Sequence, residues 1–369
     1  MLAGRKSSYR RVTAVAAIAA VAAITAACSS GGSGSAAAAG GSGGGTLNLG
    51  CYPAAAGTSW NTLFTKYVEP EFKAKYHATI NYIQGNSLDT ISKLQAEKGS
   101  PKIDAVCLDL GPNDIAQARG LLATNDPSVV TNLKNVQSFD KDPNNIGVTV
   151  SSLAAGLAYN TKEYAAHHLA PPTSWNDLTD PQVKGHVVLT DISNSQGAIM
   201  LSMLAKLHGG SETNIGPGMT AAAQVAKNSF ASTNNDDVSS YYQSGGAWLS
   251  LWTNSEEAAF QQTGFPVKFV YPKEGAVPIG QTISVVKNAP DATLAQEFEN
   301  LMLSPDIQKE IGVVCDLTPA VTNVQLPAAT AKALGVGQKM VSLDWTTINN
   351  DREDWTQQWA QSVAPNVGQ

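Results

Sequence analysis

The chain has 369 residues, with 43% hydrophobic and 15% charged side chains, 24 Lys and Arg against 30 Asp and Glu, and four cysteines. A net charge of −6 without a cluster of basic residues argues against nucleic acid as a partner. The cysteines have neither C-x-x-C spacing nor the Cys/His spacing of a zinc site, so the sequence predicts no metal site and no cofactor.

Residues 1–28 have the pattern of a secretory signal peptide. The first eleven residues carry four basic side chains and no acidic one, and residues 12–27 are uncharged and rich in Ala, Val and Ile. This apolar run is shorter than the roughly 20 residues that a helix needs to span a bilayer. Arg10 and Arg11 also fit a twin-arginine signal, so the sequence leaves open whether export is by the general or the twin-arginine route.

The end of this leader resembles the lipobox of bacterial lipoproteins, in which a cysteine is acylated and becomes the first mature residue. The matching residues are Thr25-Ala26-Ala27-Cys28, with Thr25 where the box favours Leu. Residues 29–45 are almost only Ser, Gly and Ala, a composition that stays a flexible coil because it buries little apolar surface. We therefore expect lipidation at Cys28 and a tether over 29–45.

Residues 46–369 are long enough for two lobes with a core each. In the first part, strand patterns alternate with helical ones, and Pro70 should kink or divide the first helix. The predicted strands cover 46–52, 78–83 and 103–108, and the predicted helices cover 60–76, 89–98 and 113–122. Such alternation is typical of a parallel sheet with crossover helices.

The same pattern restarts after residue 150. Strands are predicted over 155–159, 186–189, 247–252, 267–271 and 282–286, and helices over 197–207, over 295–302 and from Pro305. Ser304 before Pro305 has the arrangement of a helix cap followed by proline in the first turn. The whole body is therefore predicted to be α/β.

Four stretches of this body together resemble the solute-binding proteins of bacterial ABC importers, in the branch of polyamine and ferric-iron binders. They are GLAYNTKEY, PTSWNDLTDPQVKGHVVLTD, YPKEGAVPIGQTISVVKNAP and FENLMLSPDIQKEIG. The resemblance implies a two-lobed type II periplasmic-binding-protein fold, with crossing strands near 150–160 and 278–285 and a ligand cleft between the lobes. Lobe 1 would hold residues 46–154 and 282–324, and lobe 2 would hold 155–281 and 325–369.

Candidate ligand-binding residues follow the strands, because ligands meet the carboxyl ends of strands and the amino ends of helices in such sheets. The candidates are Tyr52, Asp109, Ser193, Asn194, Ser195, Trp252, Asn254 and Gln281. One residue among Ser193, Asn194 and Ser195 could simply cap the helix that follows. Three other candidates also have a structural alternative. Tyr52 could pack at a lobe edge, Asp109 could cap a helix, and Trp252 could lie in a core, although Trp248 is the better core candidate.

The resemblance also constrains the ligand. Polyamine binders hold several ammonium groups with carboxylates, but Ile192, Ser195 and Gln281 occupy the matching places here. Because unpaired buried charge is very costly, a zwitterionic or anionic solute is expected instead. Iron binders use adjacent tyrosines, whereas Tyr241 and Tyr242 lie about ten residues too early and are expected on a helix surface or in a core.

We therefore expect a lipid-anchored, non-enzymatic, monomeric binding subunit on the outer face of a Gram-positive cell membrane. It would capture a small solute by cleft closure and deliver it to an ABC permease. A surface adhesion or peptide-binding protein, exposing Trp345, Trp355 and Trp359, is one alternative, although the i, i+4 spacing of the last two favours a docked helix. An exported enzyme is the other. Which of the three body cysteines pair is left open.

Overall fold

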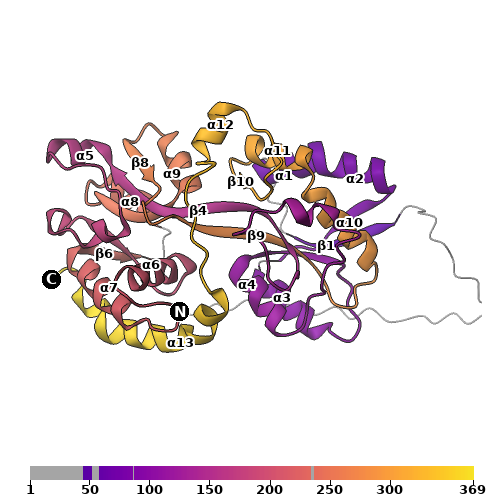
Figure 1. Ribbon diagram of the computed structural model, residues 1–369, viewed down its shortest axis with the longest axis horizontal. Helices are drawn as coiled ribbons and strands as arrows, with labels where there is room; N and C mark the ends of the chain where they lie inside the picture. The colour runs from indigo at the N-terminus through magenta and orange to yellow at the C-terminus, as the bar shows by residue number, and fades with distance from the viewer. Residues whose placement is uncertain (1–44, 52–57, 86, 234–236) are drawn as a thin grey trace, which may run out of the picture. The chain divides into compact units, whose positions relative to one another are not determined.

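The computed structural model describes residues 45–51, 58–85, 87–233 and 237–369 (Figure 1). The predicted leader, the lipidation site Cys28, almost the whole tether and Tyr52 lie outside these ranges. Within them, no helix is both long and apolar enough to cross a membrane.

A ten-stranded mixed sheet organises the fold, in the order β2-β1-β3-β9-β4-β7-β5-β6, with β8 and β10 also pairing with β4. Its strands are β1 (Thr46–Gly50), β2 (Thr79–Tyr82), β3 (Ala105–Asp109), β4 (Val148–Asn160), β5 (Val187–Thr190), β6 (Ser229–Thr233), β7 (Leu249–Thr253), β8 (Val267–Val270), β9 (Val277–Val285) and β10 (Thr318–Pro319).

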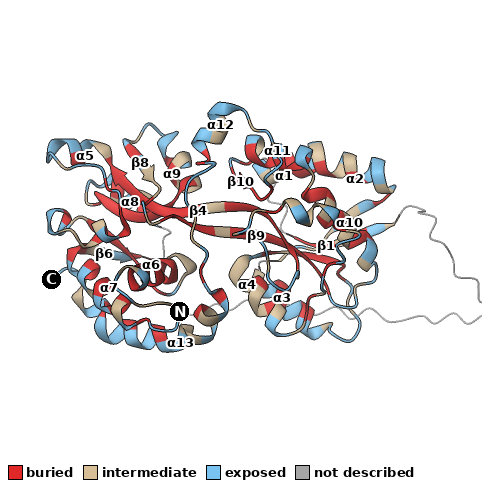
Figure 2. Ribbon diagram, viewed as in Figure 1, coloured by how far each residue is buried: buried red, intermediate tan, exposed pale blue. Residues whose placement is uncertain are grey.

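Two long strands connect the two ends of this sheet. β9 pairs antiparallel with β3 and with β4, and the 13-residue β4 continues to pair with β7 and β8. Figures 1 and 2 show β4 and β9 running side by side through the middle of the sheet, both largely buried. The crossing strands predicted near 150–160 and 278–285 are confirmed.

Helices flank the sheet. They are α1 (Ser59–Leu63), α2 (Glu69–Tyr76), α3 (Ser87–Ala96), α4 (Leu110–Ala118), α5 (Thr161–Ala166), α6 (Ser195–Leu207), α7 (Gly216–Asn228), α8 (Val238–Gln243), α9 (Asn254–Gln261), α10 (Ala292–Met302), α11 (Pro305–Val314), α12 (Ala328–Ala333) and α13 (Trp345–Ser362). Ser304 caps α11 as predicted, with its side chain accepting from the Ile307 amide. Helix α7 was not predicted, because it begins with Gly216-Pro217-Gly218, which is typical of a loop.

The first predicted helix is divided just before Pro70. A π-helical turn, η1 (Phe64–Val68), separates α1 from α2, and the Glu69 amide donates to the carbonyl of Phe64, five residues back. Proline has no amide hydrogen to donate, so the helix around Pro70 cannot keep its full ladder of hydrogen bonds. The wider turn directly precedes this gap.

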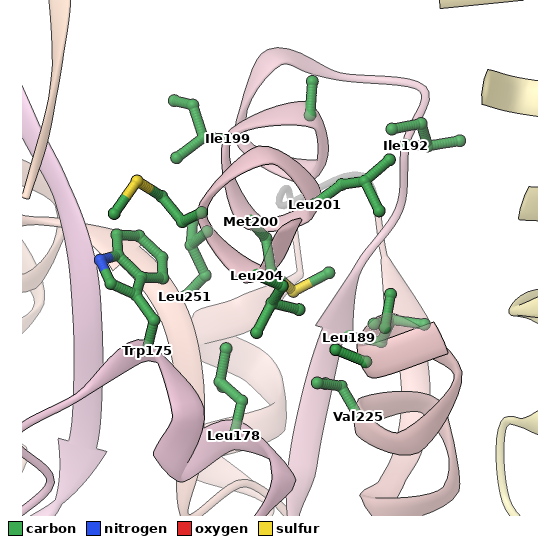
Figure 3. Close-up of a cluster of buried hydrophobic side chains, with 14 of the residues drawn as sticks. Trp175, Leu178, Leu189, Ile192, Ile199, Met200, Leu201, Leu204, Val225 and Leu251 are labelled. Carbon is green, nitrogen blue, oxygen red and sulfur yellow. The ribbon is translucent and has the colours of Figure 1, made fainter. Parts of the chain in front are cut away.

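One large core lies around β4, β5, α6 and α7 (Figure 3). Trp175 is fully buried in it, and its Nε1 donates to the Gly275 carbonyl at 2.8 Å. Trp355 and Trp359 of α13 are each 2% exposed and belong to the same core, so the predicted docking of this helix is confirmed. Trp345 is 9% exposed, and the exposed tryptophan face that an adhesion protein would need is therefore absent from α13.

A second core lies around β1, the helices α1 and α2, and α10 and α11. Phe72 and Phe298 meet edge to face in it, with 5.5 Å between ring centroids. The predicted lobe boundaries stay a prediction, since the continuous sheet joins the elements that carry the two cores.

A disulfide joins Cys51 to Cys107, just after β1 and within β3. Cys315 is a free, buried cysteine, and burial raises the pKa of its thiol to about 12. The pairing that the sequence left open is thus Cys51 with Cys107. The bond links two neighbouring parallel strands, at the carboxyl end of β1 and in the middle of β3.

Replacing both bridged cysteines, Cys51→Ser with Cys107→Ser, should lower the free energy of unfolding by about 2–4 kcal/mol. The physical reason is that the unfolded chain regains the freedom that a cross-link over 56 residues removes. Urea unfolding checks this, and reduced wild-type protein should match the double variant. Cys315→Ala is the control that keeps the bond, and an unchanged unfolding free energy in the double variant would contradict the expectation.

Candidate functional site

A cavity of about 720 Å³ opens at the carboxyl ends of β1, β2 and β3. This is the edge where ligands are expected to meet a parallel sheet. Its lining residues are Cys51, Trp60, Phe64, Gln84, Gly85, Ser87, Cys107, Leu108, Asp109, Val150, Gln281, Thr282 and Ile283. Two of the sequence candidates, Asp109 and Gln281, are among them.

Among the described residues that line this cavity, Asp109 is the only acidic one. It stands at the N-cap position of α4, yet its side chain makes no capping hydrogen bond, so the alternative of a helix cap is wrong. Its Oδ2 instead accepts from the hydroxyl of Ser87 at 3.3 Å, and the residue is exposed. The carboxylate is therefore accessible from the cavity.

Gln281 lies directly opposite Asp109 in the β3–β9 pairing. Its Oε1 accepts from the hydroxyl of Ser151 on β4 at 3.0 Å, which orients the amide. The pairing of β9 with both β3 and β4 thus places a polar amide beside the Asp109 carboxylate.

The cavity also has an apolar side, an aromatic wall that the sequence analysis did not predict. Trp60 and Phe64 line the cavity with ring centroids 5.9 Å apart. The helical spacing predicted a helix here, but spacing alone does not say whether Trp60 faces the core or a cavity. The cavity can therefore accept a ligand with an apolar portion next to a single carboxylate.

The second group of candidates lies in the loop between β5 and α6. Asn194 caps α6, with its Oδ1 accepting from the Gly197 amide at 3.0 Å, so the capping interpretation holds for this residue. The Ser193 amide donates to Asp191, and Ser193 itself is exposed while Ser195 is half-buried. None of these three residues lines the 720 Å³ cavity, so the structure does not bring them together with Asp109.

Arg352 on α13 supports this loop from behind. Its Nη1 donates to the carbonyls of Ile192 and Asn194, both at 3.0 Å. Its Nε is buried without a hydrogen-bond partner in the described part of the chain, and no carboxylate there lies within 4.0 Å of the guanidinium. Burial lowers the pKa of Arg352. A cation thus lies next to the amino end of α6, which itself favours negative charge.

Two of the candidates, Trp252 and Asn254, are buried and contact other parts of the fold. Trp252 is 4% exposed and packs on Tyr242 with 5.7 Å between ring centroids, so the alternative of a core residue describes it and the expected ligand stacking does not. Its side of β7 faces the cluster beneath α8 and α9. Asn254 is buried, and its Oδ1 accepts from the Ala154 amide at 2.8 Å, which ties the start of α9 to β4. Trp248, the expected core residue, is 8% exposed.

The tyrosine pair does not form an iron site. Tyr242 is fully buried, its hydroxyl donates to the Ala158 carbonyl at 2.6 Å, and burial raises the pKa of the phenol far above its usual range. Tyr241 contacts Phe230 edge to face. Among the residues that the structure describes, no group of three His, Cys, Asp or Glu side chains could hold a metal ion.

The family described as "Bacterial extracellular solute-binding protein" matches residues 68–336. The spermidine/putrescine-binding periplasmic proteins of Escherichia coli and Salmonella typhimurium are each 27% identical over 283 residues, which cover 72% of this chain and 79% of each relative.

Solved structures share the fold. An ABC transporter protein from Clostridium perfringens superposes with a TM-score of 0.75 at 19% identity, covering 86% of this chain and 99% of its own. A Trichodesmium FutA protein in complex with iron and citrate gives 0.70, also at 19% identity and the same coverage. These similarities identify the fold as that of type II periplasmic-binding proteins.

The role of Arg352 can be tested with Arg352→Gln. We expect faster amide hydrogen exchange over residues 191–197, because two carbonyls lose a charged donor, and a loss of about 1.5–3 kcal/mol in the free energy of unfolding. Hydrogen-exchange mass spectrometry measures the first effect. Glu353→Gln, an exposed neighbour on α13, is the control. Unchanged exchange in the loop would show that Arg352 does not position it.

Proposed function

The chain belongs to the bacterial extracellular solute-binding proteins, and on that basis we propose that it captures a small zwitterionic solute for an ABC importer. Its relatives and structural neighbours are binding proteins, so the chain is a solute-binding protein and not an enzyme. Proteins of this kind hand their solute to a membrane permease.

The solitary carboxylate of Asp109 carries the proposal for the ligand's cationic end. The carboxylate can pair one ammonium group, and the Trp60 ring, which lines the same cavity, can cover an adjoining apolar segment. A polyamine with several ammonium groups would leave charges unpaired in a closed cleft, which is very costly. Gln281 offers amide hydrogen bonds but no further charge.

The loop of Ser193, Asn194 and Ser195 is proposed for the anionic end. It lies at the amino end of the 13-residue helix α6, where the helix dipole favours anions, and Arg352 adds positive charge behind it. Closure of the lobes would bring this loop toward Asp109, and the ligand would stabilise the closed state by its higher affinity for it.

The proposed setting is the outer surface of a Gram-positive cell. The lipobox-like residues ending in Cys28 and the Gly/Ser-rich segment 29–45 support a lipid anchor followed by a tether. The folded part would then work as a monomer close to its permease.

Thermal unfolding of the mature chain against a solute panel tests the proposal. The panel holds amino acids, aminophosphonates, thiamine, putrescine, spermidine and ferric citrate. A zwitterion at 100 times its Kd should add roughly 2.7 kcal/mol to the unfolding free energy. Asp109→Asn should abolish this gain, and Ser193→Ala with Ser195→Ala should reduce it.

The matched control for this experiment is Glu353→Gln, which removes an exposed carboxylate far along the chain from the cavity. Stabilisation by spermidine alone would overturn the zwitterion assignment and leave solute binding intact. A gain from a zwitterion that survives Asp109→Asn would remove Asp109 from the site.

A further inference from the structure

The Cys51–Cys107 disulfide lies in the wall of the 720 Å³ cavity, since both cysteines are among its lining residues. The proposed function uses Asp109, Trp60 and Gln281 of this cavity and gives the disulfide no part in it. The two cysteines are not equally covered, because Cys51 is 6% exposed whereas Cys107 is half-buried. Cys107 is therefore the cysteine that a molecule in the cavity reaches more easily.

Cys107 and Asp109 share one face of β3. Side chains alternate along a strand, so residues two apart point to the same side, with their Cα atoms about 7 Å apart. The exposure along β3 follows this alternation: Cys107 is half-buried and Asp109 is exposed, while Leu108 between them is buried. A short molecule that is held by the carboxylate of Asp109 can thus reach the disulfide.

The other cysteine that the structure describes cannot open this bond from within. Cys315 is not among the lining residues of the cavity, it is 8% exposed, and burial raises the pKa of its thiol to about 12. Because the thiolate is the form that attacks a disulfide, Cys315 has almost no reactive form at neutral pH. A thiol that opens the bond from the cavity side has to enter from solution.

The cavity can admit such a thiol and select it by charge. Its volume lies within the roughly 300–1,000 Å³ of small-molecule sites. The described lining residues include the carboxylate of Asp109 but no Lys or Arg. By Coulomb's law this carboxylate attracts an ammonium group and repels a second carboxylate. A thiol that also carries an ammonium group should therefore reach the disulfide faster than a thiol that carries a carboxylate.

We propose that the disulfide is a modification site inside the cavity, at which a small aminothiol forms a mixed disulfide with Cys107. The thiolate sulfur of the incoming molecule bonds to Cys107 Sγ while the bond between Cys107 and Cys51 breaks. The electron pair of that bond leaves with Cys51 Sγ, which takes a proton from solvent. The aminothiol is the only co-reactant, and attack of Cys51 on the mixed disulfide reverses the step. The adduct takes up space in the cavity that contains Asp109.

Opening kinetics of the folded protein test the proposal. The mature chain carries Cys28→Ser, so that no thiol outside the described residues reacts, and it is incubated with cysteamine, 2-mercaptoethanol or 3-mercaptopropionate. Freed thiols are alkylated and located by peptide mass spectrometry. Each rate is divided by the rate for the same chain unfolded in urea, which removes differences in intrinsic reactivity between the thiols.

The normalised rates should follow the charge of the thiol. Cysteamine should open the bond at least fivefold faster than 3-mercaptopropionate, with neutral 2-mercaptoethanol between them. Asp109→Asn should bring the three normalised rates to within twofold of one another, because it removes the charge that selects among the thiols. Glu353→Gln removes an exposed carboxylate that is not among the lining residues and should leave the order unchanged.

Single-cysteine variants identify the reacting sulfur. Cys51→Ser leaves Cys107 as a free thiol in the cavity wall, and Cys107→Ser leaves Cys51 there. With cystamine, the disulfide of cysteamine, Cys107 in the first variant should form its adduct at least tenfold faster than Cys51 in the second, because Cys107 is the more exposed residue. Circular dichroism checks that both variants are folded, and the opening kinetics need neither of them.

Three results would overturn the proposal. They are no opening of the bond in the folded protein by any of the three thiols, normalised rates that are independent of thiol charge, and a charge order that survives Asp109→Asn. Faster adduct formation at Cys51 than at Cys107 would also overturn it. The chemistry does not rest on the zwitterion assignment, so failure of the solute panel leaves this test unaffected.

Discussion

The antiparallel pairing of β4 with β9 is the constraint on which the rest of the structure depends. These strands are the shared centre of one sheet, and every other strand is reached through one of them. Their register sets Gln281 opposite both Ser151 and Asp109. The pairing is irregular between Thr149 and Ser151, at the same level as the cavity. A site at this edge thus inherits its geometry from two strands that are far apart in sequence.

The two cores beside the β4–β9 pair contain other kinds of side chain than the edge of the sheet where the 720 Å³ cavity opens. Large buried side chains such as Trp175 and Phe298 fix the two cores, and burial of that size dominates stability. The cavity edge instead keeps a carboxylate, an amide and a half-buried indole accessible to solvent. A binding protein of this family needs that division, because the lobes must stay rigid while the ligand's contacts change.

Strong local patterns predicted most of the fold. The Ser304 cap and the docked helix of Trp355 and Trp359 follow from turn chemistry and helical spacing, whereas the crossing strands were implied by the resemblance to solute-binding proteins. Trp252 shows the limit: alternation along a strand separates two faces, but it does not say which face meets a core. A further cavity, which four carboxyl groups line, could not be predicted for another reason. Its carboxyl groups come from positions 114, 140, 142 and 344, which only the folded chain brings together.

The π-helical turn ahead of Pro70 has a consequence for the cavity wall. An α-helix turns by about 100° per residue, and a π turn places one more residue in a turn than α geometry does. Residues 64–68 therefore change the rotational phase between α1 and α2. Phe72 can face the core while Trp60 faces the cavity, although both belong to one helical segment. The aromatic wall is in this sense set by helical phase, and removing one of residues 65–68 would rotate Trp60 relative to α2 without deleting any of the described residues that line the cavity.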